Sequence, residues 1–173
     1  CTASSGSNCT IGDAFNGDAA TVQGIEFLFT TDLSRAGNYN MPLTFNYTYI
    51  NSEFDSDVAD TDFFGNVSKG DPIPYIPEHQ FNLSVGFLKD QWSSYVNVNF
   101  VDEVCVRASC NAFEKTDNAL TVDLSAHYAL SENVDLYGKV ENITSEEDIL
   151  GRQPYGARPN KDRTATLGVR IDF

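Results

Sequence analysis

Residues 120–140 read LTVDLSAHYALSENVDLYGKV, and a short polar break divides this stretch into two runs of alternating apolar and polar residues. The first run extends from Leu120 to Tyr128, and the second extends from Val134 to Val140. Successive side chains of a strand point to opposite faces, so a period of two predicts two strands that are each apolar on one face. The break at Ser131-Glu132-Asn133 is short enough for a tight turn. The stretch therefore predicts an antiparallel β-hairpin.

The same period of two recurs along the rest of the chain. It is present in five further segments, at residues 25–30, 43–49, 81–87, 95–100 and 165–173. No segment shows a convincing amphipathic helical period. Seven strands and an all-β fold are therefore predicted.

The connections between these segments alternate in length. Short connections are predicted at 34–40, 89–91 and 131–133, and long loops at about 1–19, 51–80, 102–118 and 143–163. Tight turns at one end of an up-and-down sheet and extended loops at the other are typical of outer-membrane barrels. Most of the predicted strands, which extend beyond these alternating segments, are expected to hold about nine to twelve residues, the length that a tilted strand needs to cross a bilayer. An antiparallel transmembrane β-barrel is favoured over a soluble sandwich, which has no reason for alternating loop lengths.

The composition excludes other classes of protein. The 173 residues include 11 Lys+Arg and 25 Asp+Glu, a formal net charge of −14. This balance argues against a nucleic-acid binder, which needs a basic patch to displace counterions. No apolar run is long enough for a transmembrane helix, which needs about eighteen residues. The mean hydropathy of −0.30 suggests a soluble protein, but in a barrel the charges belong to loops and a wet lumen while apolar residues face lipid.

Four cysteines form two close pairs in the sequence, Cys1 with Cys9 and Cys105 with Cys110. Neither pair is a C-x-x-C and no histidine lies nearby, so the usual ligand spacing for zinc is missing. Three connectivities remain open from sequence, and local pairing is favoured because each disulfide then closes a short loop. Disulfides indicate an oxidising compartment; the alternative is free thiols in a cytosolic protein.

The C-terminal residues 166–173, TLGVRIDF, follow the terminal pattern of outer-membrane barrels. The pattern places Gly168, Ile171 and Phe173 at the positions of a glycine, an apolar residue and an aromatic end. The segment resembles the signal that the barrel assembly machinery reads.

Three further stretches resemble TonB-dependent receptors. Residues 137–144 (YGKVENIT), followed by 151–159 (GRQPYGARP) and Arg163-Thr164, are similar to the closing region of these receptors. Residues 20–26 (ATVQGIE) and 76–83 (IPEHQFNL) resemble two other strand elements of the same family. The matches come in the family's order and cover most of the chain from residue 20 to residue 173.

The resemblance implies a 22-stranded barrel with an N-terminal plug, of which residues 1–173 form about seven C-terminal strands. It implies a multi-pass protein of the outer membrane of a Gram-negative bacterium, not an enzyme, that imports a scarce nutrient with energy delivered through TonB. The likeness to ferric-citrate and siderophore receptors favours a ferric chelate as cargo. The expected partners are outer-membrane lipid, the remainder of the barrel and plug, the TonB complex and the barrel assembly machinery, and no nucleic acid.

A cluster of basic residues in the loop 143–163 is the candidate ligand site. It contains Arg152, Arg158, Lys161 and Arg163, together with Tyr155. Guanidinium groups bind carboxylate- or catecholate-rich chelates through paired hydrogen bonds. A structural role is favoured, in which the arginines pair with the acidic run Glu146-Glu147-Asp148 or with lipid phosphates, and ligand binding is kept as a hypothesis.

Other polar clusters have simpler interpretations. The oxygen atoms of Asp55, Asp57, Asp60 and Asp62 are suitable for Ca²⁺, but the EF-hand register of glycine and glutamate is missing, so a solvated acidic loop is favoured. No catalytic motif, resident metal or cofactor is predicted. The residues expected to face the lumen and meet the plug or water are Glu26, Asp123, His127, Lys139, Glu141 and Arg170.

Two alternatives to a transport receptor remain open from sequence. One is a secreted β-sandwich binding module whose loops are stapled by disulfides. The other is an outer-membrane porin or adhesin without a plug. A plug and TonB box upstream would support the receptor, and a chain that folds as a monomer without detergent would support the sandwich.

Overall fold

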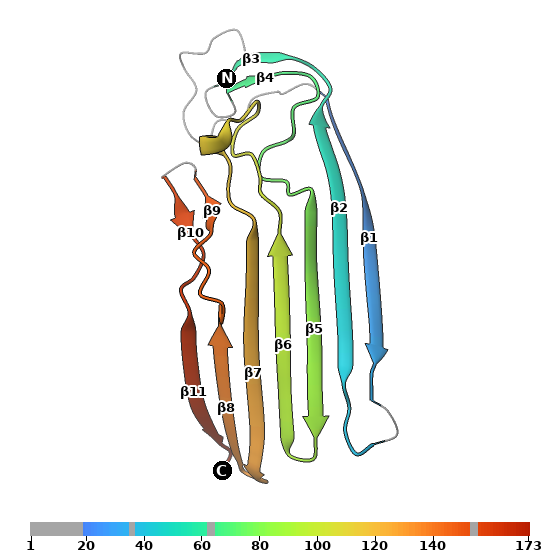
Figure 1. Ribbon diagram of the computed structural model, residues 1–173, viewed down its shortest axis with the longest axis vertical. Coiled ribbons are helices and arrows are strands. Elements are labelled where there is room, and N and C mark those ends of the chain that lie inside the picture. The colour runs from blue at the N-terminus through green and yellow to red at the C-terminus, as the bar shows by residue number, and fades with distance from the viewer. Residues whose placement is uncertain (1–18, 35–36, 62–64, 153–155) are drawn as a thin grey trace.

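The computed structural model describes residues 19–34, 37–61, 65–152 and 156–173. Its main element is a seven-stranded antiparallel sheet in the order β1-β2-β5-β6-β7-β8-β11 (Figure 1). The strands are β1 (Ala20–Asp32), β2 (Pro42–Phe54), β5 (His79–Lys89), β6 (Trp92–Val101), β7 (Ala119–Ser131), β8 (Val134–Glu141) and β11 (Thr164–Ile171). Each strand pairs with the next one of this sheet along the chain, which confirms the predicted up-and-down arrangement.

The long connections contain regular structure that the sequence patterns did not predict. β2 continues to Phe54, so the predicted loop boundary at residue 51 is wrong. After β2, β3 (Val58–Thr61) and β4 (Gly65–Val67) form a small hairpin. A single 3-10 turn, η1 (Ala112–Glu114), lies in the next long connection, and β9 (Ile149–Gly151) pairs with β10 (Arg158–Pro159) in the last. These elements hold only two to four residues each, too few to show a period.

The short turns lie at the end of the sheet opposite the long loops (Figure 1). Asp90 and Gln91 join β5 to β6, and Glu132 and Asn133 join β7 to β8. Asp90 has φ of +51°, a left-handed conformation that Asp and Asn tolerate better than most residues. The Asp32 carboxylate stabilises the β1–β2 connection by accepting hydrogen bonds from the backbone N–H groups of Ser34 and Met41, at 2.8 and 3.0 Å.

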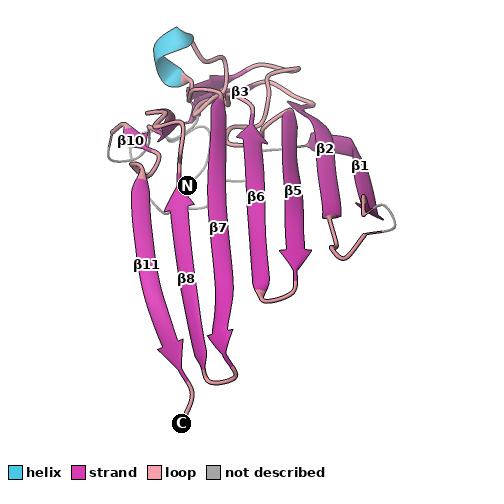
Figure 2. Ribbon diagram, turned by 60° about the horizontal axis from the view of Figure 1, so that its bottom comes forward, coloured by secondary structure: helices cyan, strands magenta, loops and turns pink. Residues whose placement is uncertain are grey.

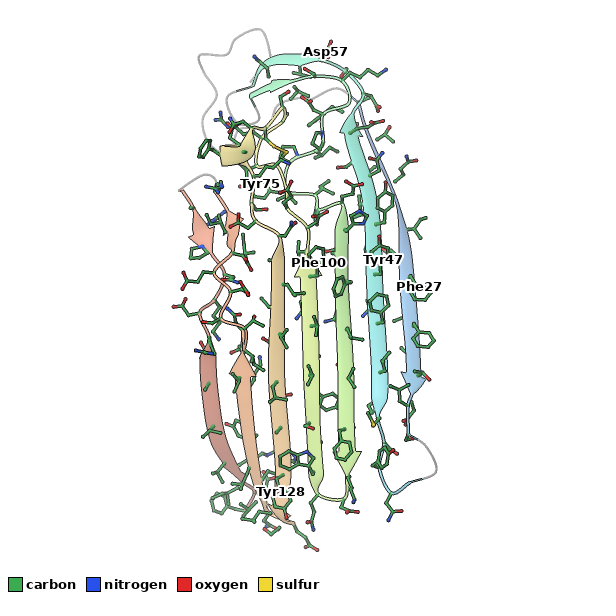
Figure 3. All side chains as sticks on the ribbon, viewed as in Figure 1. Phe27, Tyr47, Asp57, Tyr75, Phe100 and Tyr128 are labelled. Carbon is green, nitrogen blue, oxygen red and sulfur yellow. A yellow bond between two sulfur atoms is a disulfide. The ribbon has the colours of Figure 1, made fainter. Side chains whose placement is uncertain are left out.

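The strand register gives the sheet one apolar face. Directly opposed residues share a face, and one row across five strands consists of Phe27, Tyr47, Phe81, Phe100 and Leu120. Figure 3 labels three members of this row, Phe27, Tyr47 and Phe100. The same face, called the apolar face below, also carries Ile25, Phe29, Phe45, Leu83, Val85, Val96, Val98, Val122, Leu124, Leu136, Val140, Leu167, Val169 and Ile171. The Phe81 and Phe100 rings stack with centroids 5.2 Å apart.

The apolar face of β5 is bounded by a polar residue at each end. On β5 it runs between His79 at the long-loop end and Lys89 at the short-turn end. Ten residue steps at about 3.3 Å span about 33 Å along the strand, and a tilt of about 40° reduces this to about 25 Å, the height of the apolar band of outer-membrane barrels. Phe27 and Tyr47 lie in the middle of β1 and β2 because these two strands continue above this band (Figure 1).

The opposite face of the sheet is polar. One of its rows contains Asn46, Asn82, Asn99 and Thr121, and the Asn82 amide donates to the Asn99 side-chain oxygen at 2.6 Å. The register places all six residues predicted to face the lumen, from Glu26 to Arg170, on this polar face. The alternation in the sequence therefore corresponds to two chemically distinct faces of one sheet.

The buried apolar residues lie beside the long loops and not between two sheets. They are Phe54, Val58, Val67, Val106, Ala108 and Ala119. The apolar face is open: Phe27 is 51% exposed and Leu167 is 89% exposed. The β-sandwich alternative is wrong for the described residues, since the seven long strands form one curved layer and no second sheet covers its apolar face (Figure 2). None of the described helical residues forms a helix with the length and apolarity that a membrane crossing requires.

Candidate functional site

Three connections meet at the long-loop end of the sheet (Figure 1). Their described residues, 55–61, 65–78, 102–118, 142–152 and 156–163, form what we call the loop cap. Its apolar centre is a cluster of Phe54, Val58, Val67 and Ala108, against which Ile73 packs. This cluster joins the end of β2, the β3–β4 hairpin and the loop 102–118. The loop cap is therefore a packed structure with a core of its own.

Polar contacts join the first two connections of the loop cap. The Ser109 hydroxyl donates to the Asp71 carboxylate at 2.5 Å, and the Tyr75 backbone N–H donates to the Cys105 carbonyl at 3.0 Å. The predicted Cys105–Cys110 disulfide is confirmed, with Cα atoms 5.6 Å apart. It closes the loop that contains Val106, which is 1% exposed. The predicted Cys1–Cys9 pair lies outside the described residues.

The second and third connections are joined at Asp117 and Ile149. The Asp117 backbone N–H donates to the Ile149 carbonyl at 2.9 Å, and the Ile149 N–H donates to the Asp117 carboxylate at 2.8 Å. Arg152 adds a third contact, because its Nε–H donates to the Lys115 carbonyl. Hydrogen bonds therefore join the first connection to the second and the second to the third.

Asn142 organises the last connection, at the point where β8 ends. It is 3% exposed and has φ of +50°. Its side-chain amide donates to the Glu146 and Lys161 carbonyls, both at 2.9 Å, and its side-chain oxygen accepts from the Glu146 N–H at 3.2 Å. This one side chain joins the beginning and the end of the loop 142–163. Asn142 belongs to the stretch YGKVENIT that resembles TonB-dependent receptors, but the resemblance did not predict this role.

Beside Asn142, the Glu141 carboxylate connects two lysines on the polar face. Lys139 Nζ lies 2.9 Å from one carboxylate oxygen and Lys161 Nζ lies 2.6 Å from the other. Lys161 belongs to the basic cluster predicted in the loop 143–163, but its contact with Glu141 was not predicted, because the two residues are twenty positions apart in the sequence. One carboxylate between two ammonium groups leaves a formal charge of +1 at this position.

The predicted arginine cluster is divided between different roles. Arg152 is partly buried in its contact with Lys115, and Arg163 donates to the Ile143 carbonyl at 3.4 Å. Neither forms an ion pair with the acidic run 146–148 in the described part of the loop, so the predicted carboxylate partners are wrong for these two arginines. Arg158 is exposed and its guanidinium lies over Gly151. Tyr155 lies outside the described residues.

The acidic residues of the first connection do not converge. Asp55 accepts a hydrogen bond from the Thr21 hydroxyl at 2.9 Å, whereas Asp57 accepts one from the Lys69 backbone N–H at 2.7 Å. No group of three metal-ligating side chains occurs in the described part of the chain. The Asp60 side chain and Asp62 lie outside this description, so the calcium interpretation is not tested at these two positions.

The surroundings of Asp148, in the loop cap, shift the pKa of its carboxyl group. Burial, together with the nearby carboxylates of Glu146 and Asp117, raises the pKa of Asp148 above its ordinary value. The Asp148 carboxylate accepts from the Asn160 amide at 3.3 Å. A cation or hydrogen-bond donor delivered by a bound ligand would relieve this concentration of negative charge.

A match to a family model decides the relationship of the chain to known proteins. The model described as "TonB dependent receptor-like, beta-barrel" matches residues 2–143. The chain belongs to this family. Barrels of TonB-dependent receptors are outer-membrane proteins of Gram-negative bacteria, and the family consists of receptors and transporters, not of enzymes. No curated protein matches the chain in sequence.

Solved structures of such receptors share the fold. The siderophore receptor PiuA from Acinetobacter baumannii matches with a TM-score of 0.71 and 18% identity, covering 88% of this chain and 22% of PiuA. The ferric yersiniabactin uptake receptor FyuA from Yersinia pestis matches with a TM-score of 0.72 and 20% identity, covering 92% of this chain and 24% of FyuA. The ferric-catecholate import receptor Fiu from Escherichia coli K12 matches with a TM-score of 0.68 and 20% identity, covering 89% of this chain and 21% of Fiu. The chain thus spans about a fifth to a quarter of these proteins.

Proposed function

We propose that residues 1–173 form the C-terminal part of the barrel of an outer-membrane receptor that imports a ferric chelate, a siderophore or ferric citrate, with energy transmitted through TonB. The observation that carries the proposal is the family match over residues 2–143. The choice of cargo is supported by the matched structures, which are named as receptors for a siderophore, ferric catecholate and ferric yersiniabactin.

The free edges of the sheet support its being part of a larger wall. β1 and β11 each pair on one side only among the described strands. Unpaired backbone groups cost several kcal/mol each in the hydrocarbon core, so a sheet with two edges is unstable in lipid. Further strands that close the sheet into a 22-stranded barrel would pair both edges. A plug would then stand against the polar face, and the TonB complex would contact the receptor through its N-terminal part.

Each face of the sheet has a task in this proposal. The apolar face lies against outer-membrane lipid, and the polar face lines the lumen through which the cargo passes once the plug is displaced. The loop cap contacts the cargo first, and exposed Arg158 is its candidate for a carboxylate or catecholate group. Gly168, Ile171 and Phe173 at the end of the chain would be read by the barrel assembly machinery. A plug-less porin or adhesin would use the same two faces, so the test must require TonB.

Uptake of radioactive iron tests the proposal. Cells that carry the full receptor as their only ferric-chelate receptor are given ⁵⁵Fe bound to citrate, a catecholate or a phenolate siderophore, with and without TonB. Uptake of one of these chelates that disappears without TonB is expected. Uptake that persists without TonB would support a porin. Uptake of copper by a receptor that imports none of these chelates would show that the cargo is not a ferric chelate.

Arginine variants test the loop cap as the binding surface. Arg158→Ala is expected to weaken chelate binding by about tenfold, the effect of losing one charge-assisted hydrogen bond of about 1.5 kcal/mol. Arg170→Ala is the matched control, since Arg170 lies at the short-turn end and pairs with Asp172. Arg152→Ala is expected to combine weaker binding with a loosened contact at Lys115. Unchanged chelate affinity in both loop variants would reject the arginines as ligands.

A further inference from the structure

A hollow at the short-turn end of the apolar face is not used by the proposed transport function. Its volume is about 560 Å³, within the range of about 300–1,000 Å³ that ligand pockets have. The residues that line it are Phe87, Lys89, Asp90, Gln91, Trp92 and Tyr128. They come from β5, β6, β7 and the turn between β5 and β6.

The register places the hollow at the boundary of the membrane. Lys89, Trp92 and Tyr128 form one cross-strand row on the apolar face, and Figure 3 shows Tyr128 at the short-turn end. The Trp92 and Tyr128 rings lie 6.3 Å apart and are 43% and 37% exposed. Phe87 continues the hollow toward the middle of the apolar face. Tryptophan and tyrosine at this height are typical of the membrane–water interface.

The hollow presents one cation and one anion side by side. Lys89 and Asp90 are both exposed, and neither has an ion-pair partner among the described residues. The left-handed turn at Asp90 is one that this residue type tolerates. Gln91 does not add charge, and its side-chain oxygen lies 3.4 Å from the Tyr128 hydroxyl. A ligand that carries both charges close together is therefore complementary to the hollow.

We propose that this hollow binds a zwitterionic phospholipid with an ethanolamine headgroup. The phosphate pairs with the Lys89 ammonium, the ligand's own ammonium pairs with the Asp90 carboxylate and lies against the Trp92 or Tyr128 ring, and the acyl chains follow Phe87 along the apolar face. The inference rests on the outer-membrane location contained in the proposed function. The carboxylates of Asp90 and of Glu132, in the neighbouring turn between β7 and β8, disfavour a lipid with a net negative charge.

Lipid titration of the purified full receptor tests the site. Native mass spectrometry counts phosphatidylethanolamine or phosphatidylglycerol, with identical acyl chains, retained by the receptor. The wild type is expected to retain phosphatidylethanolamine more tightly. Lys89→Gln is expected to weaken its binding by up to about fivefold, the effect of losing an exposed ion pair. Trp92→Leu should weaken it by a similar factor.

Two variants separate recognition of a zwitterion from general binding of lipid. Asp90→Asn keeps a residue that tolerates the left-handed turn, and it should weaken phosphatidylethanolamine binding while leaving phosphatidylglycerol binding unchanged or stronger. Lys69→Gln, in the loop cap, is the matched charge control and should change neither. Heat-dependent gel migration verifies that each variant is folded.

The outcomes against the proposal are distinct. Equal retention of the two lipids by the wild type would overturn it, as would equal losses in Lys89→Gln and Lys69→Gln. Equal weakening of both lipids by Asp90→Asn would also overturn it. Chelate uptake is measured separately: uptake without lipid selectivity rejects the lipid site alone, and lipid selectivity without uptake rejects the transport proposal alone.

Discussion

Replacing Gly168 with alanine gives a test of how the last strand joins the sheet. Gly168 on β11 lies directly opposite Tyr137 on β8, on the polar face. A Cβ atom at Gly168 would lie 2.1 Å from Cζ of the Tyr137 ring, far inside contact distance. The tyrosine ring thus covers the glycine, an arrangement that protects the glycine's backbone and fills the space that its missing side chain leaves.

The magnitude follows from two opposing terms. Overpacking against the ring costs about 1–3 kcal/mol, whereas alanine in a strand is about 0.5–1 kcal/mol more favourable than glycine. Gly168→Ala is therefore expected to lower the free energy of unfolding by up to about 2.5 kcal/mol. In a Tyr137→Ala background the clash is gone, and the same substitution is expected to raise it by about 0.5–1 kcal/mol.

A double-mutant cycle in the full receptor measures both values. Urea unfolding in lipid vesicles, followed by the fraction that still migrates as a folded barrel, gives the stability of the wild type, both single variants and the double variant. The expected coupling energy is about 1–3 kcal/mol, with a change of sign between the backgrounds. Tyr137→Phe is the control that keeps the ring and therefore the clash. An equal effect of Gly168→Ala with and without the Tyr137 ring would refute the reasoning.

Three further predictions concern the loop cap. Asn142→Ala is expected to destabilise the loop 142–163 by about 2–4 kcal/mol, because four side-chain hydrogen bonds are lost; trypsin should then cleave after Lys161 in intact cells, and Asn142→Asp should have a smaller effect. Replacing Cys105 and Cys110 with serine is expected to cost about 2 kcal/mol, since the disulfide closes a short loop, and hydrogen exchange should increase in residues 102–118; unchanged exchange would contradict this. The raised pKa of Asp148 means that its contribution to stability is greatest below the ordinary aspartate pKa and falls as pH rises through the higher, folded-state pKa. Asp148→Asn should remove that decline from a pH series of proteolysis of the loop, and an unaltered pH profile would show that Asp148 is not its source.

The strands could be predicted from sequence because a half-buried sheet imposes a period of two. Leu120 to Tyr128 and Val134 to Val140 show it directly, and the register confirms that their apolar positions share one face. The additional elements β3, β4, β9 and β10 were missed because elements of two to four residues are too short for periodicity to show. β3 and β4 pair with each other, and their Val58 and Val67 pack against Phe54 at the end of β2. β9 and β10 pair with each other, and Ile149 of β9 is held by hydrogen bonds to Asp117.

The candidate site was less predictable than the fold. The arginines of the last loop were identified as a group, but Arg152 is used to hold the loop 102–118 and Arg163 to hold Ile143. Contacts such as Ser109 with Asp71 and Glu141 with Lys161 join residues 38 and 20 positions apart. Hydrogen-bond partners this distant leave no local pattern, so spacing could not assign them.

The sequence by itself determined that this chain forms an antiparallel sheet with an apolar and a polar face, and that its long loops share one end. Alternation and turn length are local properties, and each is set by neighbouring residues. Only the tertiary structure decided that the loops form a packed cap, that Tyr137 covers Gly168, and that Lys89, Asp90, Trp92 and Tyr128 surround one hollow. These features depend on which strands are neighbours and in what register, and hydrogen bonding across the whole sheet establishes both.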